Sequence, residues 1–156
     1  MNNTELKKIA NNVRKDIVTA VHAAKSGHPG GSLSAVDIFT FLYFEEMNID
    51  PANPKDPKRD RFVLSKGHTA PGLYSTMAER GYFDSKELVN LRHTGSFLQG
   101  HPSMNYLPGI DMSTGSLGQG ISSAVGMALA TKVNHLDYRV YTLLGDGELE
   151  EGQVWE

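Results

Sequence analysis

The sequence contains no cysteine and only one tryptophan among its 156 residues. Without cysteine the chain has no disulfide, no thiolate metal ligand and no cysteine nucleophile, which agrees with a reducing compartment. No apolar run approaches the roughly 18 residues of a membrane-spanning helix. The N-terminus, MNNTELKK, also lacks the apolar stretch of a secretory signal. We therefore expect a cytoplasmic protein with no membrane partner.

An excess of positive charge is also missing, because the formal net charge is −3. The one dense group of basic residues, at positions 55–61, is interrupted by Asp56 and Asp60. This pattern predicts no nucleic-acid partner, and it favours a solvated loop of mixed charge over a phosphate-binding loop. With 39% hydrophobic and 21% charged residues, the composition is that of a globular protein. Residues 1–156 show no linker or repeat, and we expect them to belong to a single domain.

The spacing of apolar residues and the positions of glycine and proline predict the order of the secondary structure. We expect helices at residues 6–24, 36–44, 71–80, 85–92 and 121–133, and strands at 62–64 and 139–144. The expected end signals are Asn3 or Thr4 and Gly27 for the first helix, a Ser34–Asp37 capping box, Gly81, and Ser85. Three prolines in residues 48–61 predict a surface loop. Strands separated by helices indicate an α/β fold with a parallel sheet flanked by helices.

Five short segments combine glycine with histidine or acidic residues, and two of them lie within or beside the long irregular stretch at 94–117. They are residues 26–31 (SGHPGG), 66–68 (KGH), 100–102 (GHP), 114–120 (TGSLGQG) and 145–148 (GDGE). His28 and His101 each lie between glycine and proline, which restricts the backbone on both sides. Together with His68 they could orient a phosphate, sugar hydroxyls or a transferring proton. Ordinary surface histidines and a three-histidine metal site remain the alternatives, whereas His22, His93 and His135 are expected on the surface.

Glycines 115, 118 and 120 precede the helix expected at 121–133. They would let backbone N–H groups and the positive end of the helix approach an anion such as a diphosphate. The same small residues would equally suit close helix packing, because the helix itself is rich in glycine, alanine and serine. Both interpretations stay open, and both can hold together.

Asp146 follows an apolar strand, which places it at the carboxyl end of the expected parallel sheet, where open α/β folds bind ligands. A carboxylate there can hold a divalent cation against phosphate oxygens. The alternative is an Asp-Gly hairpin turn, although residues 148–156 resemble the start of a helix more than a returning strand.

In their order along the chain, these segments resemble the N-terminal part of transketolase. The resemblance is greatest to the N-terminal subunit of split bacterial and archaeal transketolases. It implies the thiamine-diphosphate-binding α/β fold and the transfer of a two-carbon ketol unit between sugar phosphates. The cofactors it implies are thiamine diphosphate and Mg2+ or Ca2+. In such an enzyme the cofactor supplies the carbanion chemistry and the protein positions the reactants.

The resemblance also implies roles for individual residues. His28 and His101 would line the substrate channel, and His68 would lie beside the diphosphate. Asp146 would be a metal ligand, and Glu151 with Glu156 would lie where subunits meet. The implied cofactor-binding residues are His68, Gly115, Ser116, Leu117, Gly145, Gly147 and Glu151.

The chain departs from the family pattern after Gly147. The family pattern continues for about 25 to 30 residues to an asparagine that completes the metal site, whereas this sequence ends nine residues after Gly147. We therefore expect an incomplete diphosphate-binding domain that is inactive alone and needs a C-terminal transketolase subunit or further domains in a homo- or hetero-oligomer. The alternatives are a related thiamine-diphosphate enzyme, such as 1-deoxy-xylulose-5-phosphate synthase, and a non-catalytic dimerisation module.

Overall fold

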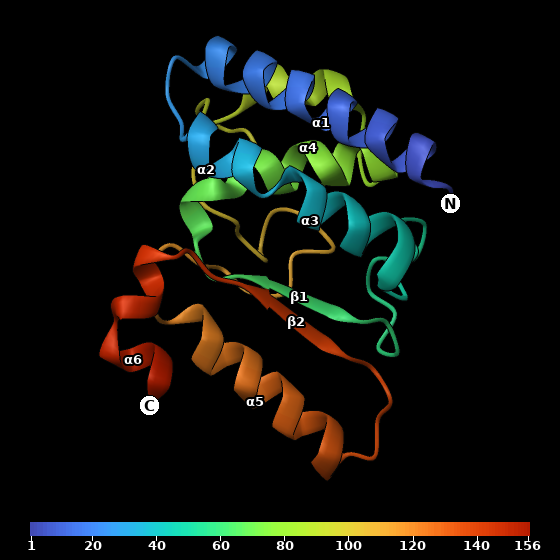
Figure 1. The fold of residues 1–156 in the computed structure, drawn as a ribbon, viewed down its shortest axis with the longest axis vertical. Coiled ribbons are helices and arrows are strands. Elements are labelled where there is room, and N and C mark those ends of the chain that lie inside the picture. The colour runs from blue at the N-terminus through green and yellow to red at the C-terminus, as the bar shows by residue number, and fades with distance from the viewer.

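Helices cover both faces of a short parallel sheet in the computed structural model, which describes residues 1–156 (Figure 1). The α-helices are α1 (Asn3–Ala24), α2 (Pro29–Ser34), α3 (Val36–Phe41), α4 (Ala70–Arg80), α5 (Gly120–Val133) and α6 (Gly152–Trp155). The strands are β1 (Arg61–Leu64) and β2 (Val140–Leu143). A π-helical turn η1 (Leu42–Glu46) and the 3-10 helices η2 (Gly67–Thr69), η3 (Ser85–Asn90) and η4 (Gly147–Glu150) complete the set.

The two strands run parallel, with Arg61 opposite Val140 and Leu64 opposite Leu143. Residues 62–64 are buried apolar side chains, as expected of a strand covered on both faces. Because the strands are parallel and in this register, their carboxyl ends lie at the same edge of the sheet. The predicted α/β class with a parallel sheet flanked by helices is confirmed.

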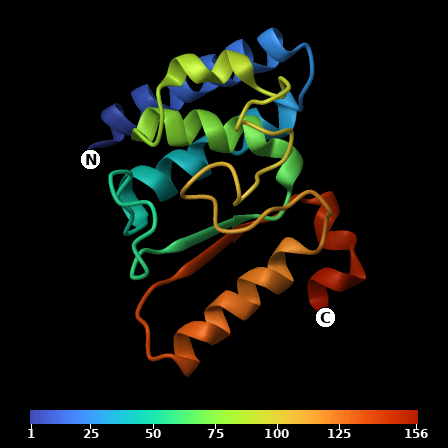
Figure 2. The same ribbon diagram turned by 180° about the vertical axis from the view of Figure 1, so that it is seen from behind.

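Helices α1, α2, α3 and α4 lie on one side of the sheet and α5 lies on the other, as both views show (Figure 2). The main core fills the space between β1 and the first group of helices. Phe62 of β1 meets the rings of Phe39 and Tyr43 edge to face, with centroids 5.9 and 5.7 Å away. Such aromatic pairs add to the stabilisation that comes from burying their area.

Helix α4 lies in the middle of this group and is buried from Ala70 to Ala78. Its Gly72 allows close packing, because a Cβ atom there would lie 2.9 Å from the Phe39 ring. Gly81 ends the helix in the left-handed conformation (φ 99°), as the sequence predicts. Helix α5 contrasts with α4, since only Gly120 and Ala124 are buried. No helix of the fold combines the length and the apolarity that crossing a membrane requires.

Several expected helix ends are wrong by a few residues. Helix α1 is capped by Asn2, whose side chain forms a capping box with Glu5, and it ends at Lys25 in the left-handed conformation, before Gly27. The predicted capping box at Ser34 does not form, because this hydroxyl donates to the carbonyl of Gly31 inside α2. The cap of η3 is Asp84, one residue before the predicted Ser85.

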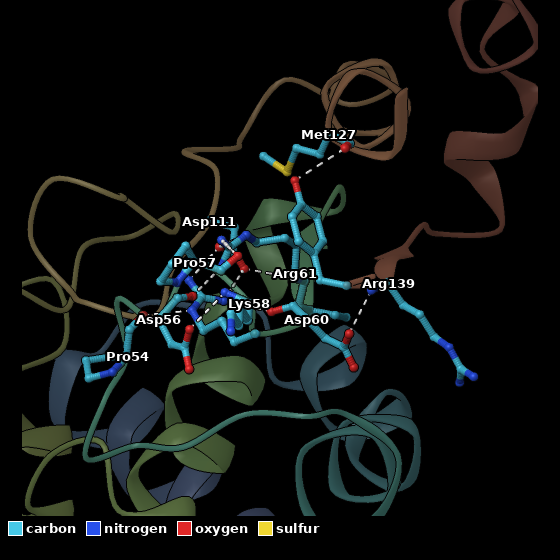
Figure 3. Close-up of polar contacts among 12 residues, drawn as sticks. Pro54, Asp56, Pro57, Lys58, Asp60, Arg61, Asp111, Met127 and Arg139 are labelled. Atoms are coloured by element: carbon cyan, nitrogen blue, oxygen red, sulfur yellow. Dashed lines mark hydrogen bonds and ion pairs between the residues drawn. The ribbon is translucent and has the colours of Figure 1, made fainter. Parts of the chain in front are cut away.

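Two segments differ from expectation in kind. No helix is expected at residues 26–31, yet this segment contains the first turn of α2, which begins at Pro29, a residue suited to the first position of a helix. The loop at 48–60 is present, but it is not simply solvated: Arg59 and Asp60 are buried. Asp60 accepts a hydrogen bond from the backbone N–H of Asn48. It accepts another from the backbone N–H of Arg139 (Figure 3).

Candidate active site

The five predicted segments converge at the carboxyl edge of the sheet. Residues 65–69 follow β1, residues 145–148 follow β2, and residues 114–120 lead into α5. Four of the five segments border a cleft of about 260 Å3, whereas residues 100–102 do not line it. The residues that line it are Gly31, Ser34, Lys66, His68, Thr69, Leu117, Gly145, Asp146, Gly147 and Glu148. Segments far apart in the sequence thus supply one concave surface at the position where α/β folds bind ligands.

His68 lines this cleft, and the His28 ring lies next to the His68 ring. Their ring centroids are 5.1 Å apart, with an angle of 67° between the planes. Burial lowers the pKa of His68 below its ordinary value of 6.5, and the nearby positive charges of His28 and Lys66 lower it further, against an opposite effect from Glu148. The His68 ring is therefore neutral at pH 7, with one donor and one acceptor nitrogen.

His101 is the third imidazole of the group, and it comes from the long segment 94–117. Its ring packs against Gly115: a Cβ atom on that glycine would lie 3.2 Å from the ring. Burial lowers the pKa of His101, and the charges of Arg92 and His28 lower it further. The structure thus brings the three predicted histidines together. They do not form a group that could hold a metal ion.

Arg92 connects the two segments that carry His28 and His101. Its guanidinium donates to the Ser26 hydroxyl at 2.8 Å and to the Gly100 carbonyl at 3.4 Å. Its backbone is left-handed (φ 61°), an uncommon conformation for a residue with a side chain. Sequence reasoning missed Arg92, because one arginine at the end of an expected helix carries no local sign of partners elsewhere in the chain.

Glu148 is a second residue whose role the sequence did not reveal. Its carboxylate is almost fully buried and accepts three hydrogen bonds, from the Ser65 hydroxyl and from the backbone N–H groups of Gly118 and Gly145. Lys66, also missed, adds a cation to the cleft lining. Both occur inside recognised segments, so the only signal was their position next to the glycines.

Asp146 stands at the start of η4 with an exposed side chain that lines the cleft. The hairpin alternative is wrong, because β2 is followed by η4 and α6 and pairs with β1 in parallel. No cluster of three or more histidine, cysteine or acidic side chains that could hold a metal ion occurs in the chain. Asp146 is thus a single carboxylate beside the backbone of Gly145 and Gly147.

The remaining predicted residues lie in three places. Leu117 lines the cleft, whereas Gly115 and Ser116 line an adjoining hollow of about 240 Å3 at the start of α5. Glu151 lies outside the cleft lining, with its side chain against Gly118. Its predicted contact with the cofactor stays a prediction.

Comparison with known families agrees with this arrangement. The family described as transketolase, thiamine diphosphate binding domain, matches residues 5–156. The chain belongs to this transketolase family. The resemblance of the five segments to transketolase is thereby confirmed.

Individual transketolase relatives resemble the chain along nearly its whole length. It is 50% identical over 152 residues to the 6-deoxy-6-sulfo-D-fructose transketolase subunit of a Clostridium species, covering 97% of this chain and 55% of that one. It is 47% identical over 143 residues to an apulose-4-phosphate transketolase subunit of Phocaeicola vulgatus, covering 92% and 50%. The chain thus spans about half the length of these two relatives.

The fold agrees with solved transketolase structures as well. The crystal structure of transketolase from Campylobacter jejuni superposes with a TM-score of 0.91 at 37% identity, covering 99% of this chain and 26% of that one. The agreement extends over nearly the whole chain, including the residues that line the cleft.

Proposed function

We propose that the chain is the N-terminal, thiamine-diphosphate-binding part of a transketolase that transfers a two-carbon ketol unit between sugar phosphates. The observation that carries the proposal is the convergence of three imidazoles, one lysine and one exposed carboxylate on the glycine-lined carboxyl edge of the sheet. When bound, thiamine diphosphate supplies the carbanion stabilisation that ketol transfer requires. The protein's own contribution is to hold the cofactor, to orient the sugar and to keep water away from both.

The residues that line the cleft suit a diphosphate. Lys66 supplies a positive charge, and His68 can donate a hydrogen bond. The space beside Gly147 is open, since no atom apart from its two chain neighbours lies within 4 Å of a Cβ position there, so an anion can come close to the backbone of this turn. Turns with exposed N–H groups are common anion-binding features. We propose that Gly145, Gly147 and Leu117 contact the cofactor, and that Gly115 and Ser116 contact it from the adjoining hollow.

We propose Asp146 as the ligand that this chain gives to Mg2+ or Ca2+. A single carboxylate fits this task, because Mg2+ in phosphate sites commonly takes one or two carboxylates and fills its other positions with phosphate oxygens and water. The proposed metal would also offset the negative charge of the diphosphate near Asp146.

The three histidines suit a sugar with several hydroxyl groups. Because the pKa values of His68 and His101 are lowered, both rings are neutral at pH 7 and each offers one donor and one acceptor. We propose that His28 and His101 bind hydroxyls of the ketose donor and that His68 lies between the sugar and the diphosphate. A neutral ring can also accept or return a proton without a large change in free energy.

The substrate and the partner follow from the relatives by analogy. Two relatives are named as subunits of transketolases for 6-deoxy-6-sulfo-D-fructose and apulose 4-phosphate, both ketoses with an anionic group. We propose that this chain likewise acts on an anionic ketose, with a sugar phosphate as the first choice. We further propose that a C-terminal transketolase subunit or further domains complete the active site in a homo- or hetero-oligomer.

Reconstitution tests this function directly. The chain is combined with its C-terminal transketolase partner, thiamine diphosphate and Mg2+, and is assayed with xylulose 5-phosphate plus ribose 5-phosphate. Two parallel reactions keep ribose 5-phosphate as the acceptor and replace xylulose 5-phosphate by 6-deoxy-6-sulfo-D-fructose or apulose 4-phosphate. A third uses pyruvate plus glyceraldehyde 3-phosphate. Ketol transfer from one of the first three ketoses supports the proposal. Turnover of pyruvate plus glyceraldehyde 3-phosphate, without turnover of any of the three ketoses, would assign the chain to a synthase. An assembly that binds no cofactor would indicate a non-catalytic module.

The metal ligand has its own test. Asp146→Asn should abolish the Mg2+-dependent part of thiamine diphosphate binding in the assembly, measured by calorimetric titration. Asp137→Asn makes the same chemical change on an exposed side chain at the opposite edge of the sheet and should leave binding unchanged. Equal binding by Asp146→Asn and the unsubstituted assembly would remove Asp146 from the metal site.

A further inference from the structure

The carboxylate of Glu148 joins three segments of the chain at the base of the cleft. The residue is 2% exposed. Its Oε1 accepts hydrogen bonds from the Ser65 hydroxyl at 2.5 Å and the Gly118 N–H at 2.9 Å. Its Oε2 accepts one from the Gly145 N–H at 2.9 Å. Both oxygens are therefore occupied, and every neighbour of the carboxylate in this network is a donor.

The three donors come from the three segments that the sheet and α5 bring to this edge. Ser65 directly follows β1, Gly118 precedes α5 and Gly145 follows β2. Ser65 and Gly118 are 83 and 30 residues away from Glu148 in sequence. Glu148 thus connects loops that are distant in the chain. It does so through charge-assisted hydrogen bonds, which are stronger than hydrogen bonds between neutral groups.

We propose that Glu148 is a positioning residue that fixes the spacing of the segments 65–68, 114–120 and 145–147 and thereby sets the affinity for the diphosphate of the cofactor. The inference rests on the proposed function, because the diphosphate is the ligand of that site. Ser65 immediately precedes Lys66, and Gly145 immediately precedes Asp146, so each hydrogen bond holds the backbone next to a side chain of the cleft.

A negative charge so close to an anion site needs an explanation. Glu148 lines the cleft, yet its exposure is minimal and its two oxygens face the Ser65, Gly118 and Gly145 donors. The carboxylate neutralises the positive ends of these donors and leaves the neighbouring Lys66 and the open space beside Gly147 for a ligand. Its role is therefore to position the cleft, while other residues contact the ligand.

The substitution Glu148→Gln tests this role with the smallest change of shape. A glutamine has one acceptor oxygen and one amide NH2 group, which only donates. Oε1 has the Gly118 N–H as a partner and Oε2 has the Gly145 N–H, so in either orientation the amide NH2 faces a backbone N–H group, which loses its hydrogen bond and separates from the side chain. Ser65→Ala is a milder change, since it removes one donor and leaves both backbone hydrogen bonds in place.

The measurement is the calorimetric titration of the assembled enzyme with thiamine diphosphate in the presence of Mg2+. We expect Glu148→Gln to weaken cofactor binding by about tenfold or more, and Ser65→Ala by about threefold. Glu150→Gln carries the same change of charge on an exposed neighbour in the same 3-10 helix and should bind like the unsubstituted enzyme. At saturating cofactor, kcat of the Glu148→Gln enzyme should return to within about twofold of the original value, because Glu148 touches no reacting group.

The outcomes separate the inference from the function on which it rests. Unchanged cofactor affinity in Glu148→Gln would overturn the positioning role, as would a fall in kcat at saturating cofactor with no change in affinity. If Glu148→Gln does not fold, Ser65→Ala decides, and unchanged affinity in that variant overturns the role. Absence of binding by the unsubstituted assembly would refute the proposed function itself, and the role of Glu148 with it.

Discussion

The guanidinium of Arg59 donates two hydrogen bonds to the carboxylate of Asp111, at 3.0 Å from Nη1 and 2.6 Å from Nη2. Both side chains are less than a tenth exposed. Asp111 also accepts the backbone N–H of Phe62 at 2.8 Å, at the start of β1. This pair therefore attaches the end of the long segment 94–117, which carries His101, to the sheet.

Removing one partner of this pair should leave a buried charge without compensation. We predict that Asp111→Asn lowers the free energy of unfolding by about 3 kcal/mol, measured by chemical denaturation. The exposed pair of Arg14 and Asp37 provides the control, and Asp37→Asn should change stability by less than about 1 kcal/mol. Similar small effects in both variants would show that the Asp111 carboxylate does not hold the loop.

Two glycines of α5 should respond oppositely to the same substitution. A Cβ atom on Gly120 would lie 2.7 Å from the Cα of Ser65, whereas nothing lies within 4 Å of a Cβ on Gly126. Gly120→Ala must displace α5 from the end of β1, and we predict a loss of about 2 kcal/mol together with weaker cofactor binding. Gly126→Ala should raise stability by about 0.5 to 1 kcal/mol, because alanine favours a helix. Thermal unfolding of both variants measures the difference, and a stable Gly120→Ala protein would contradict the close approach.

The lowered pKa values of His68 and His101 make the free energy of unfolding depend on pH. Each ring loses its proton more easily in the folded than in the unfolded chain, where the ordinary value of 6.5 applies. Their contribution to stability is therefore present above pH 6.5 and is lost as the pH falls through the lower folded pKa values. NMR titration of the ring protons should give midpoints below 6.5 for both residues.

Arg92 allows the causes of these shifts to be separated. Its charge is among the causes that lower the pKa of His101, and it is not among those that lower the pKa of His68. We predict that Arg92→Gln raises the midpoint of His101 toward 6.5 and leaves that of His68 unchanged. Equal shifts of both midpoints would show that the substitution opens the whole site.

The stability should also depend on pH through Asp16, which lies far from the cleft, between α1 and α4. Burial, together with the negative charge of Glu79, raises its pKa from 3.8 to about 6. A raised pKa in the folded state means that the stabilising contribution is complete below about pH 3.8 and is lost as the pH rises through 6. Asp16→Asn should therefore stabilise the protein at pH 7 by about 1 kcal/mol, since solvent screens part of the repulsion. Denaturation at pH 4 should show a smaller difference between the two proteins.

Much of the fold follows from local sequence patterns. The helical periodicity of α1, the apolar residues of β1 and the glycine after α4 each act within a few positions, so the sequence alone predicts them. Helix α2 is different, because Gly30 and Gly31 disfavour a helix. Its glycines suit tertiary packing instead: a Cβ atom on Gly31 would lie 2.8 Å from the side chain of Thr69, 38 positions away by residue number.

The candidate site shows the same division. The histidines and glycines of the site can be recognised because they cluster in short segments of unusual composition. Arg59, Arg92 and Glu148 cannot be recognised in this way, since their partners Asp111, Ser26 and Ser65 lie 52, 66 and 83 positions away in the chain. Long-range polar contacts of this kind leave no periodic trace, so only the fold identifies the residues that hold the site in place.

The parallel register of β1 and β2 also determines where this chain can accept new length. All five glycine-rich segments belong to the carboxyl edge, whereas the connections at 48–60 and 134–139 belong to the other edge and contain none of them. Ala52, Asn53 and Asp137 are exposed there. An affinity tag or a fluorescent label inserted at Asn53 or Asp137 would extend away from the cleft. Insertions that arise at this edge during evolution can likewise be tolerated, while the opposite edge has to keep its spacing.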